Sequence, residues 1–266
     1  MRIVPLFFVL GCGTAAFAQL ARPLPPAAPD RSFTIGAQSY GPTLTGHFSG
    51  IQDGQPISLD LDSDLGLAKD TTTPGFFMDY QGPRFAFQVS SASNEYRGDR
   101  ILNRDITLNG TTYAASDRVQ SHVKLSSVDG TWTIKLVRGQ AAYLGLDLGV
   151  QVWKIDLDAH DLPPAPATST YESTSVTAPI PQFGLAVGAK GFGDRLEAKA
   201  FFHYLGYKSA KYTRTGVDVR YFPLPWLGLR AFYDGGSFDV PKGSIKDDLE
   251  LNLDRKGGGF GVVVRF

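Results

Sequence analysis

Charged side chains recur at every second position in several otherwise apolar stretches of the chain. Asp147 lies between Leu146 and Leu148, for example, and Asp218 lies between two valines. Because successive side chains of a β-strand point to opposite faces, these charges would share one face of a sheet and the apolar residues the other. Five acidic and six basic residues fit this pattern: Asp79, Lys135, Asp147, Lys190, Glu197, Lys199, Asp218, Arg220, Arg230, Asp234 and Arg265.

The near balance of signs in this set indicates what such a face could do. A selective pore carries one dominant sign of charge around its constriction. Buried charges of both signs are tolerated where they pair and form hydrogen bonds. If a narrow closed barrel encloses this face, we therefore expect an ion-pair network that plugs the lumen, with a narrow conducting path as the alternative.

Three carboxylates alternate with leucines in the segment 59–65. In an extended chain Asp60, Asp62 and Asp64 would lie on one side, where oxygen ligands could hold Ca²⁺. The segment lacks the spacing and the final glutamate of an EF-hand loop. We favour the alternative, in which the leucines pack a strand extension over the mouth of the barrel, and we assign no metal site.

The chain has four widely spaced histidines: His47, His122, His160 and His203. No pair of them matches a metal-binding motif. Ser121 beside His122, or Asp161 beside His160, could serve a hydrolase, but neither spacing fixes a catalytic geometry. We expect solvated loop histidines and one histidine in the lumen, and we assign no catalytic residue and no cofactor.

The elements that would position these residues are alternating stretches joined by two kinds of connector. Short turns at 81–83, 138–140, 191–194 and 223–225 alternate strictly with longer polar segments at 50–75, 98–118, 159–177, 208–211 and 238–248. Short turns at one end and long loops at the other are typical of a transmembrane antiparallel up-and-down β-barrel, an all-β fold. The pattern predicts ten strands, with eight as the alternative if the short strand 76–81 or the run 212–222 is not one: 33–48, 76–81, 84–96, 119–137, 141–157, 179–190, 195–207, 212–222, 227–237 and 249–266.

The last predicted strand ends the polypeptide on an aromatic residue. Its outward face would carry Phe260, Val262, Val264 and Phe266. Outer-membrane barrels commonly end in this way, because the closing strand is presented to the assembly machinery and then pairs with the first strand. Aromatic residues also end several other apolar faces, as in the interfacial girdles of such barrels. We therefore predict that these four residues form an assembly signal.

The first residues have the features of a secretory signal peptide. A basic start and a short apolar core precede Ala16-Phe17-Ala18, which predicts a signal peptide over 1–18. The alternative is cleavage before Cys12 with lipidation of that residue. Residues 19–31, rich in proline and alanine, are then expected to form a flexible extension, and 32–266 the barrel.

Bulk composition excludes two other classes of protein. The chain has 26 basic and 26 acidic residues, so no positive excess indicates a nucleic-acid partner. Its mean hydropathy of −0.10 is too low for a bundle of transmembrane helices, each of which needs about 20 apolar residues.

The order of several short motifs resembles an uncharacterised family of Gram-negative outer-membrane β-barrel proteins. The motifs are Leu59-Asp60-Leu61-Asp62-Ser63-Asp64-Leu65-Gly66-Leu67, Arg104-Asp105-Ile106 with Gly110 and Tyr113, and Leu144-Gly145-Leu146-Asp147-Leu148-Gly149-Val150. The resemblance covers about residues 33–266 and implies a bacterial outer-membrane location, without any activity or catalytic residue. This chain differs by its proline-rich third loop.

We expect a non-enzymatic surface or envelope-integrity protein whose partners are outer-membrane lipids, lipopolysaccharide and the barrel assembly machinery. Arg97, Arg100 and Arg104 could contact lipopolysaccharide phosphates or could be ordinary surface charges. The alternatives from other classes are a passive channel for small solutes and a hydrolase like the omptins or the lipid A deacylases. The sequence does not identify a ligand or an oligomeric state.

Overall fold

The computed structural model describes residues 31–266 except 53–54, 62, 104, 109–110, 162–170, 208 and 243–249. The predicted signal peptide, Cys12 and nearly all of the predicted extension lie outside the described residues. Within those residues, no helix has the length and apolarity to cross a membrane.

The described residues form fourteen strands. Ten build the barrel and four belong to connections or extensions near its longer loops. The strands are β1 (Ser32–Gln52), β2 (Gln55–Asp60), β3 (Ala68–Thr73), β4 (Gly75–Gln81), β5 (Phe85–Ile101), β6 (Ile106–Leu108), β7 (Thr111–Tyr113), β8 (Arg118–Arg138), β9 (Ala142–Asp161), β10 (Tyr171–Gly191), β11 (Leu196–Tyr207), β12 (Ala210–Tyr221), β13 (Leu227–Val240) and β14 (Glu250–Arg265).

The barrel closes because its last strand pairs with its first. Going round the sheet, β14 pairs with β13, and each strand pairs with its neighbour through β12, β11, β10, β9, β8, β5 and β4 to β1, which pairs with β14. All of these pairs are antiparallel, as the sequence predicted. The short strand β4 is a full member of the ring, so the ten-strand prediction is confirmed and the eight-strand alternative is wrong.

Closure continues to the last residue of the chain. Phe266 N–H donates to the carbonyl of Phe33 at 2.8 Å, and Phe33 N–H donates back at 3.1 Å. Their rings also lie 6.4 Å apart between centroids. Phe260, Val262 and Phe266 are exposed on the outside of the barrel, and Val264 is half-buried.

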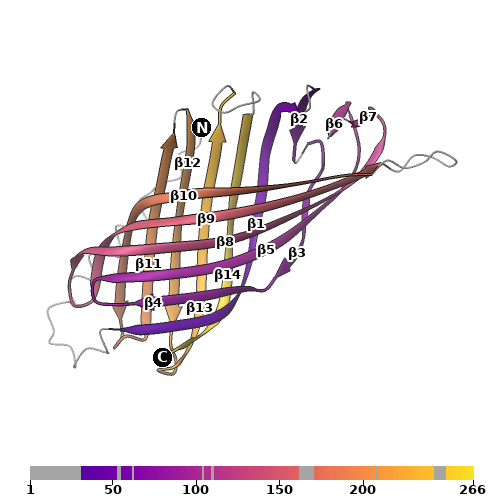
Figure 1. The fold of residues 1–266 in the computed structure, drawn as a ribbon. Helices are drawn as coiled ribbons and strands as arrows, with labels where there is room; N and C mark the ends of the chain where they lie inside the picture. The colour runs from indigo at the N-terminus through magenta and orange to yellow at the C-terminus, as the bar shows by residue number, and fades with distance from the viewer. Residues whose placement is uncertain are drawn as a thin grey trace.

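Several strands are longer than the sequence predicted. The segments at 50–75, 98–118 and 159–177 were predicted to be loops, but β2, β3 and the ends of β5, β9 and β10 lie within them. The prediction took alternating apolar residues as the sign of a strand. Main-chain pairing between neighbouring strands continues into stretches where polar residues replace the apolar ones. The strands β5, β8, β9 and β10 therefore form a long wall that lies across the front of Figure 1, and β11 to β14 rise behind it.

Two ends of the barrel can be distinguished. The end with the short connections 82–84, 139–141, 192–195 and 222–226 is called the turn end, and the opposite end is called the loop end. Ser32 and Phe266 both lie at the turn end, because Phe33 pairs with the last residue there.

In the turn-end half, apolar side chains face outward and polar ones face inward. Leu144, Leu148 and Val150 are each about 40% exposed on the outside, while Asp147 and Gln151 of the same strand are fully buried. Tyr204, Tyr221 and Tyr233 are also exposed, as girdle residues are.

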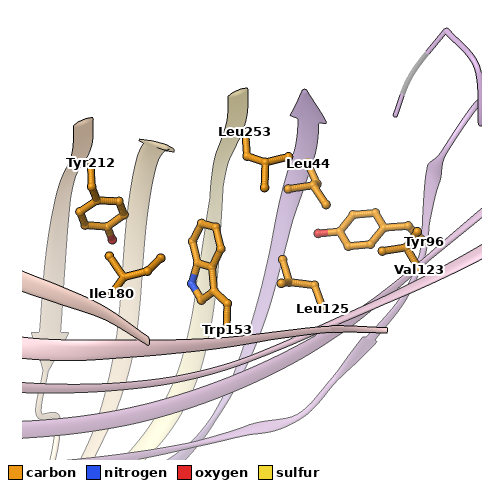
Figure 2. Close-up of a cluster of buried hydrophobic side chains, with 8 residues drawn as sticks. All are labelled: Leu44, Tyr96, Val123, Leu125, Trp153, Ile180, Tyr212 and Leu253. Carbon is orange, nitrogen blue, oxygen red and sulfur yellow. The ribbon is translucent and has the colours of Figure 1, made fainter. Parts of the chain in front are cut away.

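In the loop-end half the same strands reverse this arrangement. Along β9, Trp153 faces inward and Lys154 outward, and buried or half-buried apolar residues then alternate with polar ones to the end of the strand. Figure 2 shows the resulting apolar cluster, in which side chains from the long wall point toward side chains from the strands opposite. Its buried members are Leu44, Tyr96, Val123, Leu125, Trp153, Ile180, Tyr212 and Leu253.

The pairing between β10 and β11 stops early. It extends from Gly191–Leu196 only to Gly184–His203, although β10 continues to Tyr171 along β9 and β11 continues to Tyr207 along β12. Beyond this point β10 carries Pro179 and Pro181, both exposed. Proline has no N–H group to donate, so its place on an edge that pairs with no described strand is the expected one.

Candidate functional site

The inner surface of the turn-end half holds an ion-pair network, which is the strongest candidate for a functional site. Its first group surrounds Arg220 of β12. This guanidinium lies 2.7 Å from Asp79 of β4 and 3.0 Å from Asp218. Arg230 of β13 lies 2.5 Å from the other oxygen of Asp218 and stacks over the ring of Phe77, with 3.9 Å between Cζ and the ring centroid. All four charged side chains are buried. Each has an oppositely charged partner in direct contact, as a buried charge requires.

A second group lies nearer the loop end and centres on Arg214. Its Nη1 lies 2.6 Å from Asp129 of β8, and its Nη2 lies 2.7 Å from Asp234 of β13. Arg255 of β14 lies 3.4 Å from Asp234, and the hydroxyl of Tyr40 donates to the same carboxylate. Two arginines and two aspartates from four strands thus cross-link the lumen.

A third group surrounds Asp147 of β9. The Nζ of Lys199 lies 3.5 Å from this carboxylate, and Nε2 of His203 lies 3.0 Å from it. The hydroxyl of Thr133 donates to the other oxygen at 2.5 Å. His203 is buried and stacked on Phe201, which makes it the predicted lumen histidine.

A fourth group lies at the turn end, where three cations share one acid. Glu197 lies 3.2 Å from Arg265, 3.4 Å from Lys190 and 3.6 Å from Arg220. Lys135 lies nearby and donates to the carbonyl of Gly82 at 2.8 Å. This group is less buried than the others and opens toward the turn end.

Two cavities adjoin the network. A cavity of about 40 Å³ lies among the buried charges and is lined by residues that include Asp129, Lys199, Arg214 and Arg255. A larger space of about 800 Å³ opens at the turn end and reaches inward as far as Lys199, Asp218 and Arg220. We call this larger space the vestibule. The inner cavity can hold a few water molecules.

All eleven charged residues singled out from the sequence lie at the inner surface or around the vestibule. Sequence reasoning missed Asp129, Arg214 and Arg255, three members of the second group. The sequence contains a signal for their inward position. Each lies an even number of residues from a charge already predicted to face inward on the same strand, and alternate residues of a strand share one face. They were missed because polar residues or glycine interrupt the apolar alternation beside each of them, such as Gly130, Thr213 and Lys256.

The residues suggested for a hydrolase do not come together as adjacent pairs. Ser121 points inward, where its hydroxyl donates to the carbonyl of Leu65 at 3.4 Å, whereas His122 lies on the outward face of β8. His122 instead lies 3.5 Å from Glu95 and 3.4 Å from Asp158, on the two neighbouring strands. The sequence could not indicate this cluster, because it depends on the register between strands. His160 and Asp161 are also successive in a strand and so point to opposite faces.

The aspartates suggested for calcium form a turn of their own. A carboxylate oxygen of Asp60 accepts a hydrogen bond from Ser63 N–H at 2.6 Å, and Asp64 accepts one from Asp60 N–H at 2.8 Å. The extended conformation expected for this segment is therefore wrong, and Asp62 lies outside the described residues. Leu65 is buried in a second apolar cluster that Leu61 and Leu67 also contact. Within the described ranges, no three His, Cys, Asp or Glu side chains are grouped to hold a metal ion.

The exterior of the loop-end half is polar and carries its own ion pairs. Arg118 of β8 donates two hydrogen bonds of 2.8 Å to Asp99 of β5, which hold the pKa of that carboxyl below its usual range. Arg97 and Arg100, suggested for lipopolysaccharide, are exposed in the same region and have partners within the protein. Arg104 lies outside the described residues.

Comparison with known proteins identifies the fold but no family. No protein-family model matches the chain, and no curated protein matches it. The solved structure of the outer membrane protease OmpT from Escherichia coli is similar with a TM-score of 0.60 and 12% sequence identity, over 91% of this chain and 99% of that one.

Two other solved barrels resemble the chain less. The translocator domain of the autotransporter NalP from Neisseria meningitidis has a TM-score of 0.35 and 10% identity, over 94% of each chain. The outer membrane protein AlkL has a TM-score of 0.39 and 13% identity, over 92% of this chain and 95% of its own. The likeness to OmpT shows that the chain has the fold of an outer-membrane β-barrel, and it reaches no further than the fold. The resemblance to an uncharacterised family stays a prediction.

Proposed function

We propose that this protein is a non-conducting barrel of the bacterial outer membrane, whose role is carried by its outer surface. The observation that supports this proposal is the filling of the lumen by two successive layers. The ion-pair network occupies the turn-end half, and the apolar cluster of Figure 2 occupies the loop-end half. In this proposal the turn end faces the periplasm, together with the first and the last residue of the barrel domain.

The two layers would block small solutes for different reasons. Water and ions must displace the paired guanidinium and carboxylate groups in the first layer, which leaves a buried charge unpaired at a cost of several kcal/mol. They must then pass the packed side chains of Trp153, Tyr212 and Leu253, which offer few hydrogen bonds. The cavity between the buried charges, about 40 Å³, is too small to form a continuous aqueous path.

The loop-end half supports a role at the cell surface. Strands β5, β8, β9 and β10 continue past the outward apolar residues, so this region is held by main-chain hydrogen bonds rather than by loops. Its exterior carries ion pairs such as Lys154–Asp156, with 2.9 Å between nitrogen and oxygen. A rigid polar projection of this kind suits contact with lipopolysaccharide or with other surface molecules.

Planar-bilayer recording tests the proposal. We expect no stepwise conductance from the purified barrel, and none from the variant Asp129→Ser/Arg214→Ser, because the apolar layer remains. Conductance should appear only when Trp153→Ala and Tyr212→Ala are added. Regular conductance steps from the unmodified protein would contradict the proposal and favour the channel.

In this proposal, the barrel assembly machinery recognises the terminal strand. Phe266 closes the ring with Phe33, and its removal should lower the yield of heat-modifiable barrel in membranes. Unchanged yield would count against an assembly role for this residue.

The contacts of His122 keep a hydrolase as the second candidate. This histidine lies between two carboxylates on the outer surface and is about one-third exposed. A general base needs such a partner to orient its ring. We expect no release of peptide or acyl product by the purified barrel. Turnover that is lost in His122→Asn and retained in Lys124→Gln, a nearby outward variant, would overturn the non-enzymatic proposal.

A further inference from the structure

The charges balance in the first three groups of the ion-pair network but not in the fourth, which lies at the vestibule. Arg220 and Arg230 are matched by Asp79 and Asp218. In the second group two arginines are matched by two aspartates, and in the third Lys199 is matched by Asp147. In the fourth group, three cations remain for one acid: Lys135, Lys190, Arg265 and Glu197. Arg138 and Asp194 also line the vestibule and carry opposite charges, so the excess around it is two positive charges.

The two lysines of this group have hydrogen-bond donors to spare. An ammonium group has three N–H donors. That of Lys135 donates to the carbonyl of Gly82 and lies 4.8 Å from the centroid of the Tyr143 ring, and no carboxylate of the described residues lies within 4 Å of it. That of Lys190 has one acidic neighbour, Glu197 at 3.4 Å. Lys190 and Arg138 are near enough to repel the charge of Lys135, while Asp79 and Glu197 are near enough to attract it.

Arg265, in contrast, is anchored by three hydrogen bonds. It donates to the carbonyls of Pro225 and Asp194 and to Glu197, and it stacks on Phe222. Of these three cations, Lys135 and Lys190 are the ones that line the vestibule. Its volume of about 800 Å³ is in the range of small-molecule sites.

We propose that the vestibule binds a small dianion, a dicarboxylate or a phosphate monoester, between the ammonium groups of Lys135 and Lys190. Two negative charges would neutralise the local excess and relieve the repulsion between the lysines. The ligand enters from the turn end, the periplasmic side in the proposed orientation. It stops at Arg220 and Lys199, whose charges already have partners. The site is a blind pocket, so binding requires no transport through the barrel.

Calorimetric titration of the purified full-length barrel with succinate and with glycerol 3-phosphate tests this inference. We expect saturable binding of at least one dianion and none of succinamide, the uncharged counterpart of succinate. The comparison of the two dianions shows whether the carboxylate or the phosphate is preferred. Lys135→Gln and Lys190→Gln should each weaken binding about tenfold, the loss expected for one charge-assisted hydrogen bond.

Lys124→Gln is the matched control, because Lys124 lies on the same strand as Lys135 but outward and near the loop end. It should leave the affinity unchanged. If Lys135→Gln does not fold, Lys135→Arg keeps the charge and should retain binding, while Lys190→Gln still tests the site. Absence of saturable binding by both dianions, or an equal loss in Lys124→Gln, would overturn the inference. Conductance is not measured here, so this result is independent of the non-conducting proposal.

Discussion

The two halves of the barrel use the same strands with opposite sidedness. In the turn-end half, β9 presents Leu144 and Leu148 outward and buries Asp147. Ten residues further along, it presents Asp158 outward and directs Leu157 to the apolar interior. The strand does not rotate between these points, because its pairing with β8 and β10 stays in register throughout this stretch. The reversal lies in the sequence and not in the backbone.

The medium outside the barrel explains this reversal. Where lipid surrounds the barrel, apolar side chains are most stable outside, and the polar ones collect inside, where they must pair. Where water surrounds the barrel, the strands follow the rule of soluble sheets. Their apolar side chains face inward and their polar side chains face outward. In the proposed orientation, we therefore expect the change between Val152 and Lys154 on β9 to mark the outer boundary of the hydrocarbon region.

The largest expected effect tests the ionic interior of the turn-end half. Arg220→Ala leaves Asp79 without its arginine and takes one of two from Asp218, so the free energy of unfolding should fall by about 3–5 kcal/mol. Urea titration in lipid vesicles measures it. Arg118→Ala, which breaks an exposed pair in the loop-end half, should cause little change. Similar losses in both variants would contradict the difference between the halves.

A charge on the outer face tests where lipid ends. Leu146→Arg places a guanidinium among outward apolar residues and should cost about 2–4 kcal/mol near the bilayer midplane. Ser173→Arg, outward on β10 beyond the reversal, should change stability by no more than about 0.5 kcal/mol. The same vesicle titration compares the two, and an equal cost would place the hydrocarbon boundary elsewhere.

The smallest effect concerns pH at the loop-end exterior. Arg118 lowers the pKa of Asp99, so their pairing contributes fully above the usual pKa of an aspartate and is lost as pH falls through the lowered value. Below about pH 4, the protection of amides near Asp99 and Arg118 against hydrogen exchange, relative to the intrinsic rate at each pH, should fall. Protection in β12 beside Arg220 should not change over the same range. Loss of protection at both places would indicate a general loosening rather than a local one.

The sequence predicted the features that depend on local patterning. A period of two and the alternation of short and long connections were sufficient for ten strands, closure and the inward position of residues such as Asp147. The reversal was also visible, since apolar residues occupy even positions up to Val152 and odd positions from Trp153 on β9. It was missed because each stretch was assigned to a single face.

The partners within the site could not be predicted in the same way. The partner of Arg214, for example, is Asp129, which lies 85 residues away in the chain on another strand. The contact of His122 with Glu95 and Asp158 depends on the register of three strands. Local patterning gives the face of a residue, whereas its neighbours across the lumen follow from barrel size and strand stagger.

The early end of the β10–β11 pairing has a consequence for the behaviour of many barrels together in one membrane. An unpaired strand edge can recruit a strand from another molecule and start a chain of intermolecular sheets. Pro179 and Pro181 deprive the β10 edge of two N–H donors at this position. We therefore expect that crowded copies do not extend one another's sheets at this seam.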